Sequence, residues 1–148
     1  MSTGVSMSTR AQENGRLSLG LLLVRVACSL TFLYHGSAIL FGAFGGPGPA
    51  GFAGPHHWPA VIGFLVGLAQ FAGGIAIITG ILFRVGAACT FVVMLGAILM
   101  VHLPHGFDVG HGGMEYALTE LLISGAFLLT GPGAYSLGRW LPSPLREW

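Results

Sequence analysis

Residues 17–41 read LSLGLLLVRVACSLTFLYHGSAILF, and this stretch decides the fold class. A helix needs about 20 predominantly apolar residues to cross a ~30 Å hydrocarbon core, and this stretch is longer than that. Arg25 is its one charged residue. We therefore expect a first membrane-spanning helix here.

Three further apolar runs follow, at residues 59–79, 85–103 and 114–130, and segments rich in glycine and proline separate them. Hydrophobic residues make up 53% of the 148 residues and charged residues only 7%, against about 25% charged in soluble domains. The sequence predicts an all-α fold, a four-transmembrane-helix bundle with lipid as its main surroundings. Residues 1–16 should be a flexible cytoplasmic tail, 17–137 the membrane domain and 138–148 a cytoplasmic C-terminal segment.

The positions of the arginines indicate the orientation. Arg10 and Arg16 precede the first run, Arg84 lies between the second and third, and Arg139 and Arg146 follow the fourth, whereas the other two loops contain no Lys or Arg. Cytoplasmic loops carry the excess of basic residues. We expect both termini in the cytoplasm and a multi-pass membrane protein.

Small residues predict how the helices pack. Gly63 and Gly67 form a G-x-x-x-G pattern in the second run, and small residues let helix backbones approach closely in lipid. We expect this pattern to serve packing within the chain. Cys28 and Cys89 have no C-x-x-C spacing and are interpreted as packing residues.

All six histidines fall in the outer half of the predicted topology or in its outer loops: His35, His56, His57, His102, His105 and His111. The spacing H-x-x-H-x5-H from His102 onward matches no established ligand signature, so we expect no metal site. His35 and His102 end their spans at the same level as Glu115. These three are predicted to form a pocket for a quinone or another polar ligand, the alternative being histidines that cap helix ends.

Three polar residues lie deeper, namely Arg25, Gln70 and Glu120. Charges at membrane depth normally face the bundle interior and pair. At about 1.5 Å per residue, Arg25 and Glu120 reach similar depths, so we expect them to share a network, with Gln70 as a candidate bridge. Whether this network fixes helix register or carries protons is left open.

Several motifs together resemble the DoxX family of small bacterial four-helix membrane proteins. They are Leu23-Val-Arg25, Phe32-Leu-Tyr-His35-Gly36, Gly67-Leu-Ala-Gln-Phe-Ala-Gly73-Gly74, Met94-Leu-Gly-Ala97, Gly112-Gly113-Met-Glu115-Tyr and Gly131-Pro-Gly133-Ala-Tyr-Ser136-Leu137. The family often has an acidic residue where Gln70 stands and Asp where Gly138 stands, so no carboxylate role carries over to Gln70.

The resemblance implies a multi-pass protein of the bacterial inner (plasma) membrane and a redox-associated subunit, because the family is named for a subunit of a thiosulfate:quinone oxidoreductase. The chain has no C-x-x-C-H and only two scattered cysteines, so haem and iron–sulfur signatures are missing. The leading hypothesis is a quinone-dependent oxidoreductase component with a membrane or extracytoplasmic redox partner, and no catalytic residue is assigned. The alternatives are a non-catalytic membrane anchor or assembly subunit, and a small transporter or proton-conducting protein. No nucleic-acid partner is expected, and oligomerisation is left open.

Overall fold

The computed structural model describes residues 3–142, and this part of the chain is helical with no strand. The longer elements are α1 (Thr3–Phe41), α2 (Gly48–Ala53), α3 (Ala60–Thr79), α4 (Phe83–Ala97) and α5 (Glu115–Thr130). A π-helical turn, Ile98–His102, extends α4, and short 3-10 turns lie at Ala43–Gly45, Gly54–His56, Leu103–His105, Val109–His111 and Leu137–Trp140. The expected all-helical class is confirmed.

Three helices within residues 3–142 are long and apolar enough to cross a membrane: Gln12–Phe41, Ala60–Thr79 and Phe83–His105. They correspond to the first three apolar runs of the sequence. The fourth run forms α5, which has 16 residues and therefore a length of about 24 Å. It is shorter than the ~30 Å hydrocarbon core.

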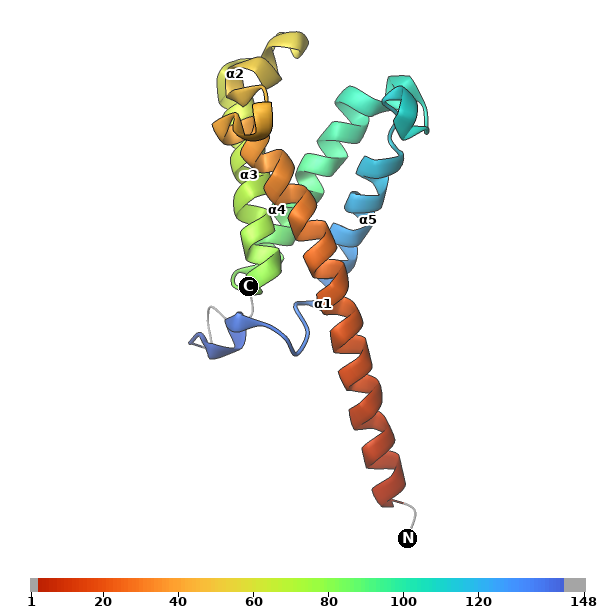
Figure 1. The fold of residues 1–148 in the computed structure, drawn as a ribbon. Coiled ribbons are helices and arrows are strands. Elements are labelled where there is room, and N and C mark those ends of the chain that lie inside the picture. The colour runs from red at the N-terminus through yellow and green to blue at the C-terminus, as the bar shows by residue number, and fades with distance from the viewer. Residues whose placement is uncertain (1–2, 143–148) are drawn as a thin grey trace.

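The helices pack in chain order, α1 on α3, α3 on α4 and α4 on α5. Figure 1 shows two arms, α1 with α3 and α4 with α5, which diverge toward α2 at one end. We call this the histidine end, because His56 and His102 lie there. The opposite end, with the α3–α4 turn, Arg84 and Arg139, is called the arginine end.

Glycines set the close approach of α3 to its neighbours. A Cβ on Gly67 would lie 2.9 Å from the backbone nitrogen of Leu40 in α1, and one on Gly73 would lie 2.8 Å from Cγ2 of Thr90 in α4. These distances leave no room for a side chain. The expected packing role of Gly67 within the chain is confirmed.

Residues 3–16 continue α1 as helix, where the sequence suggested a flexible tail. They extend past the arginine end, away from the other helices (Figure 1). Once the apolar part of α1 is formed, each added residue gains a backbone hydrogen bond without a new nucleation step. Helix propagation therefore accounts for the difference.

The core lies between the arms and includes Cys28, Phe32, Ile77, Phe83 and Phe127. The rings of Phe83 and Phe127 lie 5.2 Å apart between their centroids. This packed region joins all four long helices. The space between the diverging arms therefore begins on its histidine-end side.

Candidate functional site

A cavity of about 730 Å³ lies between the two arms. Its walls are mostly apolar and come from every long helix, for example Ile39, Val66, Met94 and Ala117. Its hydrogen-bonding side chains are few: Thr31, His35, His56, Trp58, Gln70, His102 and Tyr116. A mostly apolar cleft with a few placed polar groups is the usual form of a small-molecule site.

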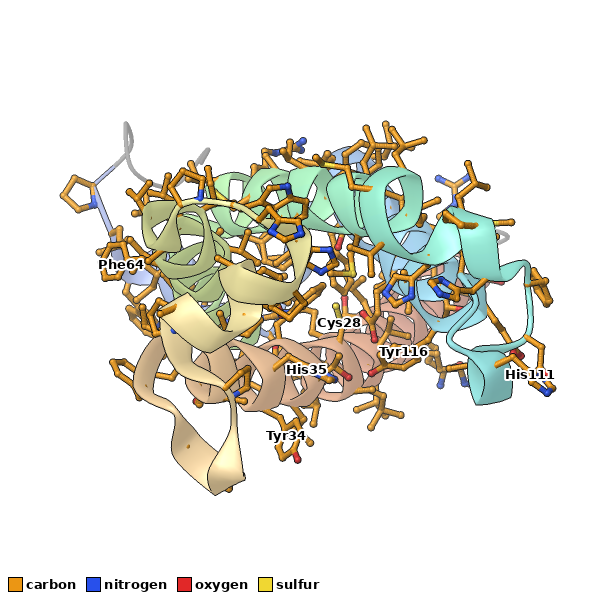
Figure 2. The ribbon with its side chains drawn as sticks, turned by 90° about the horizontal axis from the view of Figure 1, so that it is seen from above. Cys28, Tyr34, His35, Phe64, His111 and Tyr116 are labelled. Carbon is orange, nitrogen blue, oxygen red and sulfur yellow. The ribbon has the colours of Figure 1, made fainter. Side chains whose placement is uncertain are left out.

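His35 projects into this cavity from α1. Its ring centroid lies 6.4 Å from that of Tyr116 on α5. Figure 2 shows Cys28, His35 and Tyr116 turned toward the space between α1 and the α4–α5 arm, whereas Tyr34 points away from it. His35 makes no hydrogen bond within the described residues and is accessible to a ligand.

His102 lines the same cavity and ends the π-helical turn. Its Nδ1 lies 2.8 Å from the carbonyl oxygen of Gly112. Because a carbonyl only accepts, Nδ1 carries the proton in this bond, and Nε2 is the acceptor in the neutral ring. π-helical turns occur often at functional sites, and this one aims His102 at the cavity.

Glu115 lies apart from these two histidines. It is exposed, and its Oε2 accepts a hydrogen bond from the Val109 backbone nitrogen at 3.3 Å. It is not among the residues that line the cavity. The structure therefore brings His35 and His102 to one cavity but turns Glu115 to the loop before α5, because the 3-10 turns after His102 fold under the first turn of that helix.

Gln70 contributes the polar group of the α3 wall. Its side chain is 5% exposed and lies at the cavity. No side chain of the described residues binds its amide, so the amide can serve a ligand. It contacts neither Arg25 nor Glu120 through a hydrogen bond in residues 3–142.

Arg25 is fully buried at the arginine end. Its Nε donates to the Ile77 carbonyl at 2.9 Å and its Nη2 to that of Ile78 at 2.8 Å, both in the last turn of α3. Its Nη1 donates to the carbonyls of Pro132 and Tyr135, which follow α5. The expected pairing with Glu120 is not formed, since the long side chain reaches backbone carbonyls that the chain folds around it.

Glu120 is 5% exposed and lies one turn after Tyr116 on α5. Tyr116 lines the cavity, whereas Glu120 is not among its lining residues. Cys28, Thr31 and Tyr116 neighbour its carboxyl group, yet its Oε2 accepts no hydrogen bond of normal geometry within the described residues. One turn farther along α5, Ser124 bonds Thr90 at 3.0 Å. Glu120 is thus a buried carboxyl group without a charged partner.

Sequence reasoning missed Thr31 and Tyr116, whose hydroxyl oxygens lie 2.7 Å apart and join α1 to α5. Helical spacing is the signal that could have found them. Tyr116 stands four residues before Glu120, and Thr31 stands four residues before His35, so each shares a helix face with a predicted residue. At the mouth, the rings of His56 and Trp58 stack with centroids 4.4 Å apart.

The other loop histidines have local partners. His105 Nδ1 lies 3.0 Å from the Val101 carbonyl oxygen, and His111 Nδ1 lies 2.6 Å from Asp108 Oδ2. Within the described residues, no three His, Cys, Asp or Glu side chains gather as a metal site.

Comparison with known proteins gives a consistent set of relatives. The sequence model of the DoxX family matches residues 20–103. "Inner membrane protein YqjF" of Escherichia coli (strain K12) is 32% identical over 132 residues, which cover 83% of this chain and 92% of that protein. "Putative oxidoreductase CatD" of Bacillus subtilis (strain 168) is 28% identical over 118 residues, covering 80% and 84%. No solved structure matches significantly.

These matches and the three apolar helices identify a multi-pass protein of the inner membrane. The matched range includes Arg25, His35, Gln70 and His102 but ends before α5. The cavity therefore belongs to a protein that is surrounded by a lipid bilayer.

Proposed function

Because the chain belongs to the DoxX family, we propose that it is a quinone-binding membrane subunit of a redox assembly, with the quinone in the cavity between the two arms. The observation that carries this proposal is an apolar cavity of about 730 Å³ with a few hydrogen-bonding groups at the level of His35, Gln70 and His102. A quinone ring needs one or two such partners, while its tail stays in apolar surroundings.

The size and shape of the cavity support this ligand class. Its volume falls within the about 300–1,000 Å³ of small-molecule sites. Thr31 and His35 of α1 and Tyr116 of α5 line it. We propose that a lipid-soluble ligand enters the cavity from the bilayer.

The polar groups fit quinone oxygens. His102 Nδ1 is held by Gly112, so its Nε2 can accept a hydrogen bond or, when protonated, donate one. The Gln70 amide can donate to a carbonyl oxygen from the α3 wall. Histidine also exchanges protons near neutral pH, which suits a carrier that gains protons on reduction.

The redox part of the proposal is supported by the relative named "Putative oxidoreductase CatD". Because the sequence offers no haem or iron–sulfur ligand motif, electrons have to come from a partner protein in the membrane or outside it. We propose the histidine end as the side that faces this partner.

A topology of four spans with both ends in the cytoplasm completes the proposal. The start of α1 and the turn Leu137–Trp140 lie at the arginine end (Figure 1), and basic residues favour the cytoplasmic side. The short α5 can span if the bilayer thins around it.

In a chain with Cys28 and Cys89 replaced by Ala, impermeant maleimide should label Asn14→Cys and Pro49→Cys from opposite faces. Labelling from one face would contradict this topology.

Binding tests the central proposal. In nanodiscs, a Trp140→Phe, Trp148→Phe chain keeps Trp58, at the cavity mouth, as its one tryptophan. Decylubiquinone should quench Trp58 fluorescence to saturation. Ala97→Phe, which fills the cavity, should abolish saturable quenching, and Ala126→Phe, on the exposed face of α5, should leave it unchanged.

The second candidate is a non-catalytic anchor or assembly subunit. The hydrogen bonds of Arg25 favour it, because this buried charge joins α3 to the segment after α5. This alternative predicts quenching that never saturates and is equal in both phenylalanine variants. Such a result would overturn the quinone proposal.

A further inference from the structure

Glu120 is the carboxyl group in the described part of the chain that is buried and has no charged partner. Its side chain is 5% exposed, and Oε2 accepts no hydrogen bond. The ion pair found within these residues joins His111 and Asp108 in the loop before α5. An unpaired anion at membrane depth is strongly disfavoured, so this site needs a proton or a cation.

Within residues 3–142, no cation is a neighbour of the Glu120 carboxyl group, and the Arg25 guanidinium of α1 binds backbone carbonyls at the arginine end instead. Its titratable neighbours are Cys28 of α1 and Tyr116 of α5, both without positive charge. The sequence of α3 contains no titratable residue. In α4, Arg84 binds the Leu128 carbonyl at the arginine end, and Cys89 is exposed. A proton is therefore the charge that can neutralise the Glu120 carboxylate in these surroundings.

Two hydroxyl groups stand between this carboxyl group and the cavity. Tyr116, one turn before Glu120 on α5, and Thr31 of α1 both neighbour the carboxyl and both line the cavity. Their oxygens lie 2.7 Å apart. Figure 2 shows Tyr116 and Cys28 turned toward the same interior space as His35.

We propose that Glu120 is a proton-binding site of the cavity and exchanges its proton with a bound ligand through the hydroxyl groups of Tyr116 and Thr31. In one transfer, Tyr116 gives its hydroxyl proton to a basic oxygen of the ligand and takes the proton of Glu120. Glu120 becomes a carboxylate, the ligand gains one proton, and no electron moves. Only the identity of the ligand rests on the proposed quinone function.

Infrared spectroscopy of the full chain in nanodiscs tests the site without any ligand. At neutral pH, the wild-type chain should show the carbonyl stretching band of a protonated carboxylic acid. Glu120→Gln should remove this band, and Glu115→Gln, an exposed carboxylate on the same helix, should retain it. A missing band, or one that survives in Glu120→Gln, would overturn the proposal.

Exchange into D₂O tests the route. The band should shift as deuterium replaces the proton, and a Tyr116→Phe, Thr31→Val variant should exchange about 10²-fold more slowly, the lower end of what a positioned proton-transfer group contributes. Thr119→Val, next to Glu120 but exposed, is the matched control. Equal exchange rates in all three chains would overturn the route. If the band and its exchange follow this pattern while decylubiquinone does not bind, the quinone function fails and the proton site stands.

Discussion

The two ends of the bundle use buried polar groups in opposite ways. At the arginine end, the Arg25 guanidinium donates to four backbone carbonyls and is fully buried. Toward the histidine end, Gln70 lines the cavity, and Glu120 has a buried oxygen without a hydrogen bond among the described residues. Buried polar groups that are fully bonded fix a structure, whereas unbonded ones are costly and call for an explanation. The difference supports the proposal that one end serves assembly and the other serves ligand binding.

The four hydrogen bonds of Arg25, which we call the arginine clamp, join segments that are far apart in sequence. Ile77 and Ile78 lie in the last turn of α3, where a cation is favoured by the helix dipole. Ser136 adds a second contact there, because its hydroxyl group donates to the Gly80 carbonyl at 3.1 Å and accepts from the Gly138 nitrogen at 3.0 Å. The arginine end therefore holds the two arms together, while the arms diverge at the histidine end.

The largest expected effect is at Arg25. Arg25→Ala should lower the free energy of unfolding by more than about 3 kcal/mol, because hydrogen bonds from a charged donor contribute about 1.5–3 kcal/mol each and four carbonyls lose their donor. Unfolding in detergent, followed by circular dichroism, measures this. Arg139→Ala, at an exposed site with a long 3.4 Å contact, is the control and should change little. Equal losses in both variants would contradict the clamp.

A smaller effect is expected at the histidine end, and it should appear in binding rather than in stability. His35→Ala and Gln70→Leu should each weaken decylubiquinone binding about tenfold, the equivalent of about 1.4 kcal/mol and of one typical hydrogen bond. The free energy of unfolding should change little in Gln70→Leu, because the Gln70 amide lines the cavity and makes no hydrogen bond with the described residues that could be lost. Destabilisation as large as in Arg25→Ala would remove the contrast between the two ends.

The smallest expected effect is at Ser136. Ser136→Ala should cost about 1 kcal/mol of stability, since it removes the bond to Gly80 and leaves the Gly138 nitrogen without its acceptor. Quinone binding should not change. Ser37→Ala, which loses only a bond to its own helix at Leu33, should be nearly neutral. A change in quinone affinity in Ser136→Ala would show that the two ends are coupled.

The helices could be predicted from the sequence because apolar runs of membrane length and glycine–proline breaks are local signals. The placement of His35 and His102 at one cavity could also be predicted, since both lie toward the histidine end of their helices, although α1 continues past His35 to Phe41. Gln70 was expected inside the bundle, and it is buried there. What these residues bind stays a prediction.

The partners of Arg25 could not be predicted, because they are backbone carbonyls, which carry no residue identity. Their positions depend on how the segment after α5 folds back at Pro132 and Tyr135. Glu115 was misplaced for a similar reason. The π-helical turn and the 3-10 turns after it set the direction in which α5 begins, and no local pattern in the sequence announces them.

Photolabelling with an azidoquinone, followed by mass spectrometry of the peptides, tests the quinone site most directly. Labels are expected on cavity residues such as His35, Val66 and Tyr116, and an excess of decylubiquinone should prevent them. Labels concentrated on lipid-facing residues such as Leu129, which is 85% exposed, and unaffected by decylubiquinone would contradict a quinone site between the arms.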